Sequence, residues 1–155
     1  FLRKRLAVTF AHVGMAILTL GVGVVTSYSL EKEIILSPKE SFKFGDQTIK
    51  FQSIEDKIGP NFFSKSATVS FDDGEELSQV VTEKRTYSPS GQLTTEAGIK
   101  ADLFKDLYVS MGDNLETEIW SFKVQIKPFI RWIWLGAFLV AIGSFFSGVR
   151  QIRRI

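Results

Sequence analysis

The sequence contains no cysteine and only one histidine among its 155 residues. The missing thiols exclude disulfides, thiol catalysis, zinc–thiolate sites and the Cys-x-x-Cys-His motif that attaches haem covalently. A single histidine excludes a metal site built from several histidines of this chain. Without a thiol or a second histidine, we find no complete set of nucleophile, base and orienting group for a hydrolytic site.

Acidic residues are absent from both ends of the chain. All 17 lie between Glu31 and Glu118. Basic residues are found at both ends: Arg3, Lys4 and Arg5 near the N-terminus, and Arg150, Arg153 and Arg154 near the C-terminus. The part between these clusters has 13 basic against 17 acidic residues, a net charge of −4. Because nucleic-acid binding needs positive charge gathered on a folded face, we expect no nucleic-acid partner.

Two long apolar runs, residues 6–25 and 132–149, lie beside these basic clusters. The first has 20 residues without an acid or a base, enough for a helix to cross the roughly 30 Å hydrocarbon core of a bilayer. A removable signal peptide fits less well, because its apolar stretch is usually only ~7–15 residues long. The basic flanks predict that both termini are cytoplasmic and that the middle is outside. The absent initiator methionine is compatible with a piece of a longer protein.

The middle of the chain has the alternation of β-hairpins. In residues 42–51, apolar and polar side chains alternate around Gly45-Asp46, which predicts a hairpin. Residues 67–71 and 77–81 flank Asp72-Asp73-Gly74 and predict a second hairpin, in whose turn we expect the acidic side chains to be solvated. A third hairpin is predicted from residues 107–111, a turn at Gly112-Asp113-Asn114, and the alternating Trp120, Phe122, Val124 and Ile126. Turns at intervals of roughly 8–12 residues are typical of small sandwiches and barrels.

These patterns together predict a mixed membrane protein, in which two transmembrane α-helices flank a β-rich extracytoplasmic domain. The expected parts are an N-terminal transmembrane helix at 1–27, a β-rich periplasmic domain at 28–128 and a C-terminal transmembrane helix at 129–155. Lys127, Arg131, Trp132 and Trp134 are expected to form an interfacial belt where the second helix begins.

His12 is the candidate functional residue. It lies in the first apolar run on a stripe of small and polar residues, Thr9, His12, Ala16, Thr19, Gly23 and Thr26. A second small stripe, Ala7, Ala11, Gly14 and Gly21, runs beside it. In the last run a stripe with small residues is formed by Trp132, Gly136, Val140, Gly143 and Ser147. Membrane helices associate through such faces, so we expect a larger helical bundle. An intramembrane histidine is either an interhelical hydrogen-bonding residue, a proton relay or a metal and haem ligand.

Glu83, Lys84, Arg85 and Glu96 are the charged residues of the middle domain that are hardest to assign. They either contact a partner or form a cross-strand charge network with one another, which contributes little to stability when exposed.

Several stretches in order resemble a known family. They are His12-Val13-Gly14, Gly59-Pro60-Asn61, residues 83–87, residues 95–99, residues 106–109 and residues 127–136. Together they resemble the C-terminal part of the CcmF family, the large membrane subunit of the cytochrome c maturation haem lyase.

The resemblance implies a location in the bacterial inner membrane, or its mitochondrial or plastid equivalent, with the middle domain in the periplasm. It also implies that His12 is an axial ligand to the iron of a resident transmembrane haem b. The implied partners are the remaining transmembrane helices of the haem lyase, a haem chaperone, apocytochrome c and membrane lipid. Because the second axial ligand and the haem-handling segment are implied to lie elsewhere, this chain is not expected to be active alone.

Two other functions remain open at this point. The chain is alternatively a non-catalytic, membrane-anchored assembly module whose outer β-domain recruits a partner, with His12 as an interhelical hydrogen-bonding residue. A proton-relay subunit fits less well, because neither apolar run contains an Asp, Glu, Lys or second His as a proton partner.

Overall fold

The structure is a computed structural model that describes residues 2–152, and the side chains of residues 5–149. It divides into two compact units. One contains the two terminal helices with the short segment Asp102–Asp106, and the other contains Leu30–Ala101 and Leu107–Ile126. Of the basic clusters that predict the orientation, Arg153 and Arg154 lie outside the described residues. The side chains of Arg3, Lys4 and Arg150 also lie outside the described part.

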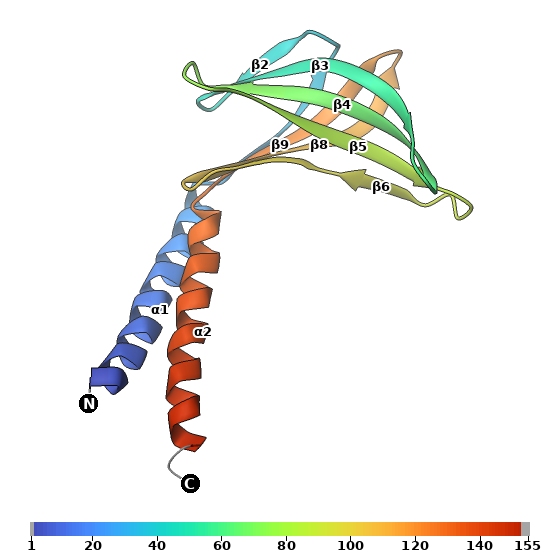
Figure 1. Cartoon of the computed structure of the whole chain (residues 1–155). Coiled ribbons are helices and arrows are strands. Elements are labelled where there is room, and N and C mark those ends of the chain that lie inside the picture. Colours follow the sequence, from blue (N-terminus) through green and yellow to red (C-terminus); the bar gives the residue numbers. More distant parts are fainter. Residues whose placement is uncertain (1, 153–155) are drawn as a thin grey trace. The chain divides into compact units, whose positions relative to one another are not determined.

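Two long helices, α1 (Leu2–Tyr28) and α2 (Ile130–Ile152), form the first unit (Figure 1). Each contains a stretch apolar and long enough to cross a membrane, Arg5–Tyr28 with a mean hydropathy of 2.0 and Ile130–Val149 with 1.8. The helices are antiparallel, since Gly21 lies against Ile133 near the start of α2 and Gly143, near its end, lies against Ala11. Together with the β-sandwich described below, this confirms the predicted fold class.

Small residues let the two helices come close. A Cβ added at Gly14 would lie 2.7 Å from the Gly136 carbonyl oxygen and 2.7 Å from the Val140 nitrogen. A Cβ at Gly143 would lie 2.7 Å from the Ala11 nitrogen. These obstacles are backbone atoms, which cannot rotate out of the way. The predicted packing role of these small residues is therefore confirmed, and it explains the glycines at these positions.

Replacing Gly14 by leucine (Gly14→Leu) is expected to separate the helices, because overpacking a close contact costs about 1–3 kcal/mol. The fraction of paired helices would fall, measured by energy transfer between fluorophores on cysteines introduced at Met15 and Phe138 in the detergent-purified chain. Gly23→Leu is the matched control, because a Cβ at Gly23 meets nothing within 4 Å. Equal energy transfer in both variants would mean that the close contact at Gly14 does not hold the pair together.

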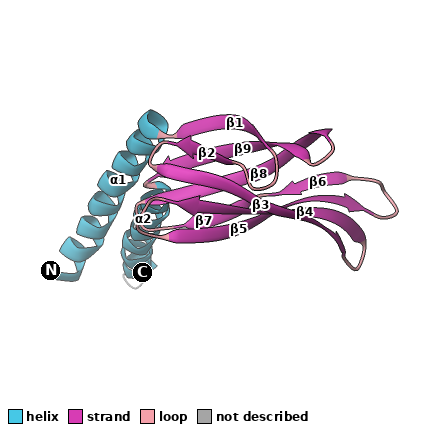
Figure 2. Cartoon of the chain, turned by 90° about the horizontal axis from the view of Figure 1, so that it is seen from above, coloured by secondary structure: helices cyan, strands magenta, loops and turns pink. Residues whose placement is uncertain are grey.

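Nine strands in two sheets form the second unit, a β-sandwich (Figure 2). Their order is β1-β9-β8-β7 in one sheet and β2-β3-β4-β5-β6 in the other. The strands are β1 (Leu30–Leu36), β2 (Ser41–Phe44), β3 (Gln47–Ile58), β4 (Phe62–Asp72), β5 (Leu77–Tyr87), β6 (Leu93–Glu96), β7 (Gly98–Ala101), β8 (Lys105–Glu116) and β9 (Ile119–Pro128). The predicted first and second hairpins are confirmed as β2–β3 and β4–β5. Gly45, with φ of 61°, makes the first of these turns.

The hydrophobic core lies between the inner faces of the two sheets. Phe51 of β3 and Phe122 of β9 meet at its centre, with ring centroids 4.9 Å apart and ring planes at 60°. The buried apolar residues of this core are Ile34, Leu36, Ile49, Phe51, Ala67, Val69, Phe71, Leu107, Val109, Met111, Trp120, Phe122, Val124 and Ile126. Every second residue of a strand faces inward, which is why the alternation in the sequence is so regular.

An irregularity in β3 changes which residues face inward. The pairing with β4 shifts by one residue between Phe51 and Ser53, which is the signature of a β-bulge. Before the bulge the odd-numbered residues of β3 are buried, and after it Ile54 packs against the core instead. The last part of β3 therefore turns Asp56 and Ile58 toward the inner side of the sheet.

The third hairpin is present, but its predicted turn is wrong. Strand β8 continues through Gly112, Asp113 and Asn114 to Glu116, and the turn lies at Thr117-Glu118. Gly112 is needed in the strand because a Cβ there would lie 2.2 Å from the Ser121 hydroxyl oxygen. The Asn114 amide donates to the carbonyl oxygens of Glu116 and Ile119 and so stabilises the true turn from within the strand.

Candidate functional site

His12 lies on the exposed side of α1. Its Nδ1 is 2.8 Å from the carbonyl oxygen of Val8, one turn earlier in the helix. A carbonyl oxygen only accepts hydrogen bonds, so Nδ1 carries the proton and donates it. The other ring nitrogen, Nε2, then has its lone pair free, which is the tautomer that a histidine uses to bind a metal through Nε2.

The whole stripe around His12 is uncovered. Ala16, Thr19 and Gly23 are exposed, like Thr9 and Thr26 at its two ends, and a Cβ at Gly23 would meet nothing within 4 Å. Helix α2 instead packs on the neighbouring stripe that contains Gly14 and Gly21. The small side chains beside His12 leave room for a flat group or for a closely packed helix.

His12 is not part of a metal site of several residues within the described part of the chain. Among the described residues, no group of three or more His, Asp or Glu side chains is placed to hold a metal ion. The described residues therefore offer one histidine nitrogen, Nε2 of His12, that fits an axial position of a haem iron.

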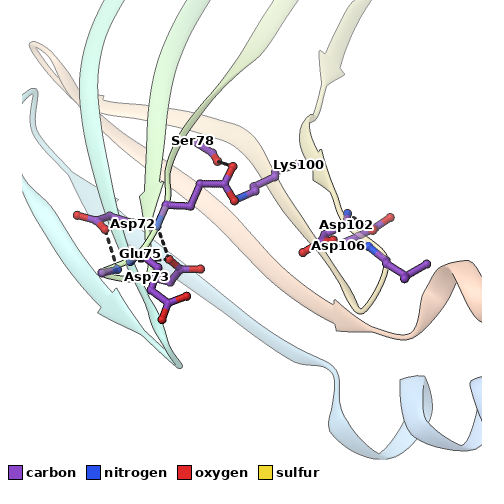
Figure 3. Close-up of polar contacts among 10 residues, drawn as sticks. Asp72, Asp73, Glu75, Ser78, Lys100, Asp102 and Asp106 are labelled. Carbon is purple, nitrogen blue, oxygen red and sulfur yellow. Dashed lines mark hydrogen bonds and ion pairs between the residues drawn. The ribbon is translucent and has the colours of Figure 1, made fainter.

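In the turn between β4 and β5, the aspartate carboxylates accept hydrogen bonds from the backbone nitrogens of the same turn (Figure 3). An Asp72 carboxylate oxygen accepts from the Gly74 nitrogen at 2.8 Å, and an Asp73 carboxylate oxygen accepts from the nitrogens of Glu75 and Glu76. Lys100 neutralises Glu76 at 3.1 Å. The carboxylates of Asp72 and Asp73 thus stabilise the turn by bonding its backbone nitrogens.

Glu83, Arg85 and Glu96 form a cluster on the outer face of the second sheet. Glu83 and Glu96 are direct cross-strand partners on β5 and β6. Two like charges in this position repel each other, but the Arg85 guanidinium bridges them, 2.8 Å from Glu83 and 3.4 Å from Glu96. The hydrogen bond to Glu83, followed by one involving Tyr87, raises the pKa of Arg85 above its usual value.

Aromatic rings complete this outer cluster. The Arg85 guanidinium carbon lies 4.6 Å from the centre of the Phe62 ring, and the Phe62 and Tyr87 ring centroids are 5.5 Å apart. The Phe62 ring also lies against Gly59, where a Cβ would be only 2.4 Å from it. The motif at residues 59–61 and the motif at residues 83–87 therefore meet in one place, although about twenty residues separate them in the sequence.

Lys84 does not belong to that cluster. The alternation of β5 turns it to the inner face, where its Nζ donates to the Gly112 carbonyl oxygen at 3.0 Å and to the Asp113 carboxylate at 2.7 Å. The grouping of Glu83, Lys84, Arg85 and Glu96 into one set is thus corrected. Lys84 ties β5 of one sheet to β8 of the other, and Asp113 is a partner that the sequence analysis missed. The alternation of β5 was the signal that separates Lys84 from its neighbours.

The ion pair with Lys84 predicts a specific pH dependence. The hydrogen bond from Lys84 lowers the pKa of Asp113, so this pair contributes stability above the unfolded pKa and loses it as the pH falls through the lower, folded value. Lys84→Met is expected to raise the pKa of Asp113 toward that of an ordinary aspartate, as measured by carboxyl NMR of the detergent-purified chain. Lys65→Met, which removes another lysine of the same face, is expected to leave that pKa unchanged. An unchanged pKa of Asp113 in Lys84→Met would contradict the pairing.

The inner face near Lys84 opens into a concavity of about 460 Å³. Ile58, Phe63 and Leu93 line it and are 82%, 60% and 57% exposed. Its charged lining residues are ion-paired: Lys65 lies 2.6 Å from Asp56, and Lys84 lies 2.7 Å from Asp113. The bulge in β3 is what turns Ile58 toward this side. An open, apolar surface of this kind is typical of contact with another molecule.

Comparison with known proteins gives relatives over nearly the whole chain. It is 33% identical over 146 residues to the cytochrome c-type biogenesis protein CcmF of Pseudomonas aeruginosa, covering 94% of this chain and 22% of that protein. It is 33% identical to the cytochrome c-type biogenesis protein NrfE of Haemophilus influenzae, covering 91% of this chain and 23% of that protein. The chain thus spans about a fifth of the length of the curated relatives it matches.

The β-sandwich matches a described family. Residues 27–128 match the family described as the CcmF C-terminal beta-sandwich. A solved structure named Cytochrome c Heme Lyase CcmF is similar in fold, with a TM-score of 0.75 and 21% identity, over 93% of this chain and 24% of that one.

Proposed function

The chain belongs to the CcmF family of cytochrome c-type biogenesis proteins, and we propose that it is the C-terminal module of a haem lyase that attaches haem covalently to apocytochrome c. The name of the similar solved structure supports the haem lyase activity, and the apolar helices support a membrane-anchored protein. Because the chain covers only 22% of its P. aeruginosa relative, the activity belongs to a larger assembly that includes the missing helices.

In this proposal His12 is one axial ligand of a transmembrane haem b. The observation that carries it is the hydrogen bond from Nδ1 to the Val8 carbonyl oxygen, which fixes the ring and leaves Nε2 as the donor atom. When bound, the haem supplies one-electron chemistry at its iron, whose potential depends on its axial ligands and burial. The exposed small residues Ala16, Thr19 and Gly23 leave the space beside His12 open to the macrocycle.

The proposed partners supply the groups that this chain does not contain and provide haem and apocytochrome c. The second axial ligand and the helices that cover the His12 stripe come from the rest of the lyase, whether in the same polypeptide or in a separate subunit. A haem chaperone and apocytochrome c are the proposed soluble partners. The proposed location is the bacterial inner membrane, or its mitochondrial or plastid equivalent, with both termini cytoplasmic and the β-sandwich periplasmic.

The test is reconstitution from two pieces. The N-terminal part of a CcmF relative is produced with and without this chain in cells that lack their own lyase. We expect the two pieces to co-purify with a b-type pyridine haemochrome spectrum and to restore haem attachment to a c-type cytochrome. Co-purification without either the spectrum or the attached haem would contradict the proposal.

A second candidate function is a non-catalytic assembly module that recruits a partner through the β-sandwich. The observation that favours it is the open concavity with its exposed Ile58, Phe63 and Leu93. Phe63→Ser separates the two functions in the same assay. If Phe63→Ser no longer co-purifies with a partner but keeps its haem spectrum, this surface recruits the partner. If Phe63→Ser loses the haem spectrum, the result does not support recruitment by this surface.

A further inference from the structure

The short segment Asp102–Asp106, which follows β7 and includes the first two residues of β8, clusters with the helices and not with the sandwich. Three hydrogen bonds hold it to the start of α2. The Phe129 nitrogen donates to the Phe104 carbonyl oxygen at 2.7 Å, the Trp132 Nε1 donates to the Leu103 carbonyl oxygen at 3.0 Å, and the Arg131 Nε donates to the Asp106 carboxylate at 3.2 Å. We call this segment the collar loop.

The collar loop is also ordered from within. The Asp106 carboxylate accepts from the Asp102 nitrogen at 3.1 Å, and the Asp102 carboxylate accepts from the Leu103 nitrogen at 2.5 Å; Asp102 and Asp106 lie close together in Figure 3. Asp106 is itself buried, with 5% of its surface exposed. The buried Asp106 carboxylate is thus bonded both within the loop and to Arg131, whereas Asp102 is exposed.

The apolar side chains of the loop are exposed. Leu103 is 58% and Phe104 is 55% exposed, although both sit on a backbone that is fixed in place. The Phe104 ring lies 5.9 Å from the Phe129 ring and 6.4 Å from the Trp132 ring, stacked on the latter. The result is a continuous aromatic surface around the first turn of α2, and exposing it to water is unfavourable.

The position of the loop beside the first residues of α2 indicates that lipid covers this aromatic surface. The stretch of α2 that can cross a membrane begins at Ile130, between Phe129 and Trp132, to which the loop is bonded. If α2 spans the bilayer, the headgroup region lies at this level. Tryptophan is enriched in that region, and Trp132 and Trp134 lie at this level of α2. Lys127 and Arg131 have side chains long enough to extend their charged ends to the headgroups.

We propose that the collar loop is a membrane-inserted anchor, in which Leu103 and Phe104 enter the lipid interface beside Trp132. The occupant of this surface is the acyl and headgroup boundary of the bilayer. The carbonyl oxygens of Leu103 and Phe104 are already bonded to Trp132 and Phe129, so these two residues enter the lipid interface without leaving these two oxygens unsatisfied. The chain is thus held in the membrane at a third place besides its two helices, and the connection between β7 and β8 lies at the membrane surface.

The absence of cysteine makes the test direct. Phe104→Cys and, separately, Leu103→Cys are labelled with a nitroxide in the full chain reconstituted in phosphatidylcholine vesicles. Collision of the label with oxygen, which concentrates in lipid, is compared with collision with a water-soluble nickel complex. Ser90→Cys, in the exposed turn between β5 and β6, is the water reference, and Phe145→Cys, 67% exposed on α2, is the lipid reference.

We expect the oxygen-to-nickel accessibility ratio at positions 103 and 104 to exceed that at position 90 severalfold, and to approach that at position 145. Far-ultraviolet circular dichroism that matches the unlabelled chain shows that each variant is folded. A ratio equal to that at position 90 at both sites would overturn the proposal, because the loop would then lie in water. Low accessibility to both reagents would overturn it as well, because a protein surface would then cover the loop.

Discussion

Replacing His12 by alanine (His12→Ala) is expected to eliminate the b-type absorption spectrum of the assembled complex while the two pieces still co-purify. The expectation rests on His12, whose Nδ1 is bonded to the Val8 carbonyl oxygen, which leaves Nε2 as the donor atom, and which lies on an exposed stripe of α1. An alanine has no donor atom for the iron, and the lone haem ligand that we assign to this chain is lost. The measurement is a reduced-minus-oxidised spectrum and a pyridine haemochrome assay of the purified complex.

Two further substitutions separate a ligand from a packing residue. In His12→Gly, added imidazole is expected to restore the spectrum, because a free imidazole fills the vacated space and binds the iron. In His12→Met, the haem is expected to remain with a higher reduction potential, as methionine ligation raises it relative to histidine. Thr9→Ala, one turn away on the same stripe, is expected to change neither spectrum nor potential. Haem retained unchanged in His12→Ala would assign His12 to helix packing instead.

The parts of the fold that could be predicted from the sequence are those determined by local patterns. The spans are apolar over the length that a bilayer requires, and the first two hairpins carry Gly45-Asp46 and Asp73-Gly74 between alternating strands. The close helix contact followed from small residues at helical spacing, because only such residues let two backbones approach to the distances seen at Gly14 and Gly143.

The features that were missed depend on contacts between distant residues. Gly112, Asp113 and Asn114 have the composition of a turn, yet each serves another purpose. Gly112 makes room for Ser121, Asp113 pairs with Lys84, and Asn114 holds the turn that follows. The bulge after Phe51 is equally invisible in the sequence, although it decides that Ile58 lines the concavity. The contacts of the collar loop are equally hard to predict, because its bonds to Arg131 and Trp132 join residues more than twenty positions apart.

Phe51→Ala is expected to have the largest effect on the β-sandwich, a loss of about 3–5 kcal/mol in the free energy of unfolding. Phe51 is fully buried, with 0% of its surface exposed, and its ring meets Phe122 edge to face across the two sheets. The truncation leaves a cavity at the centre of the core, and the lost ring pair adds about 0.5–1.5 kcal/mol to the cost of the lost burial. Urea unfolding followed by the fluorescence of the buried Trp120, in a chain with Trp132→Phe and Trp134→Phe, measures this loss.

Ile58→Ala, on the same strand, is the matched control, because its side chain is 82% exposed and we expect little change in stability. The same pair of variants also tests whether the two units act separately. If the haem ligand is carried by α1, Phe51→Ala destabilises the sandwich but the assembled complex keeps its b-type spectrum. A spectrum lost in Phe51→Ala and retained in Ile58→Ala would mean that the folded sandwich is required for haem binding, and a ligand on α1 alone would not explain that requirement.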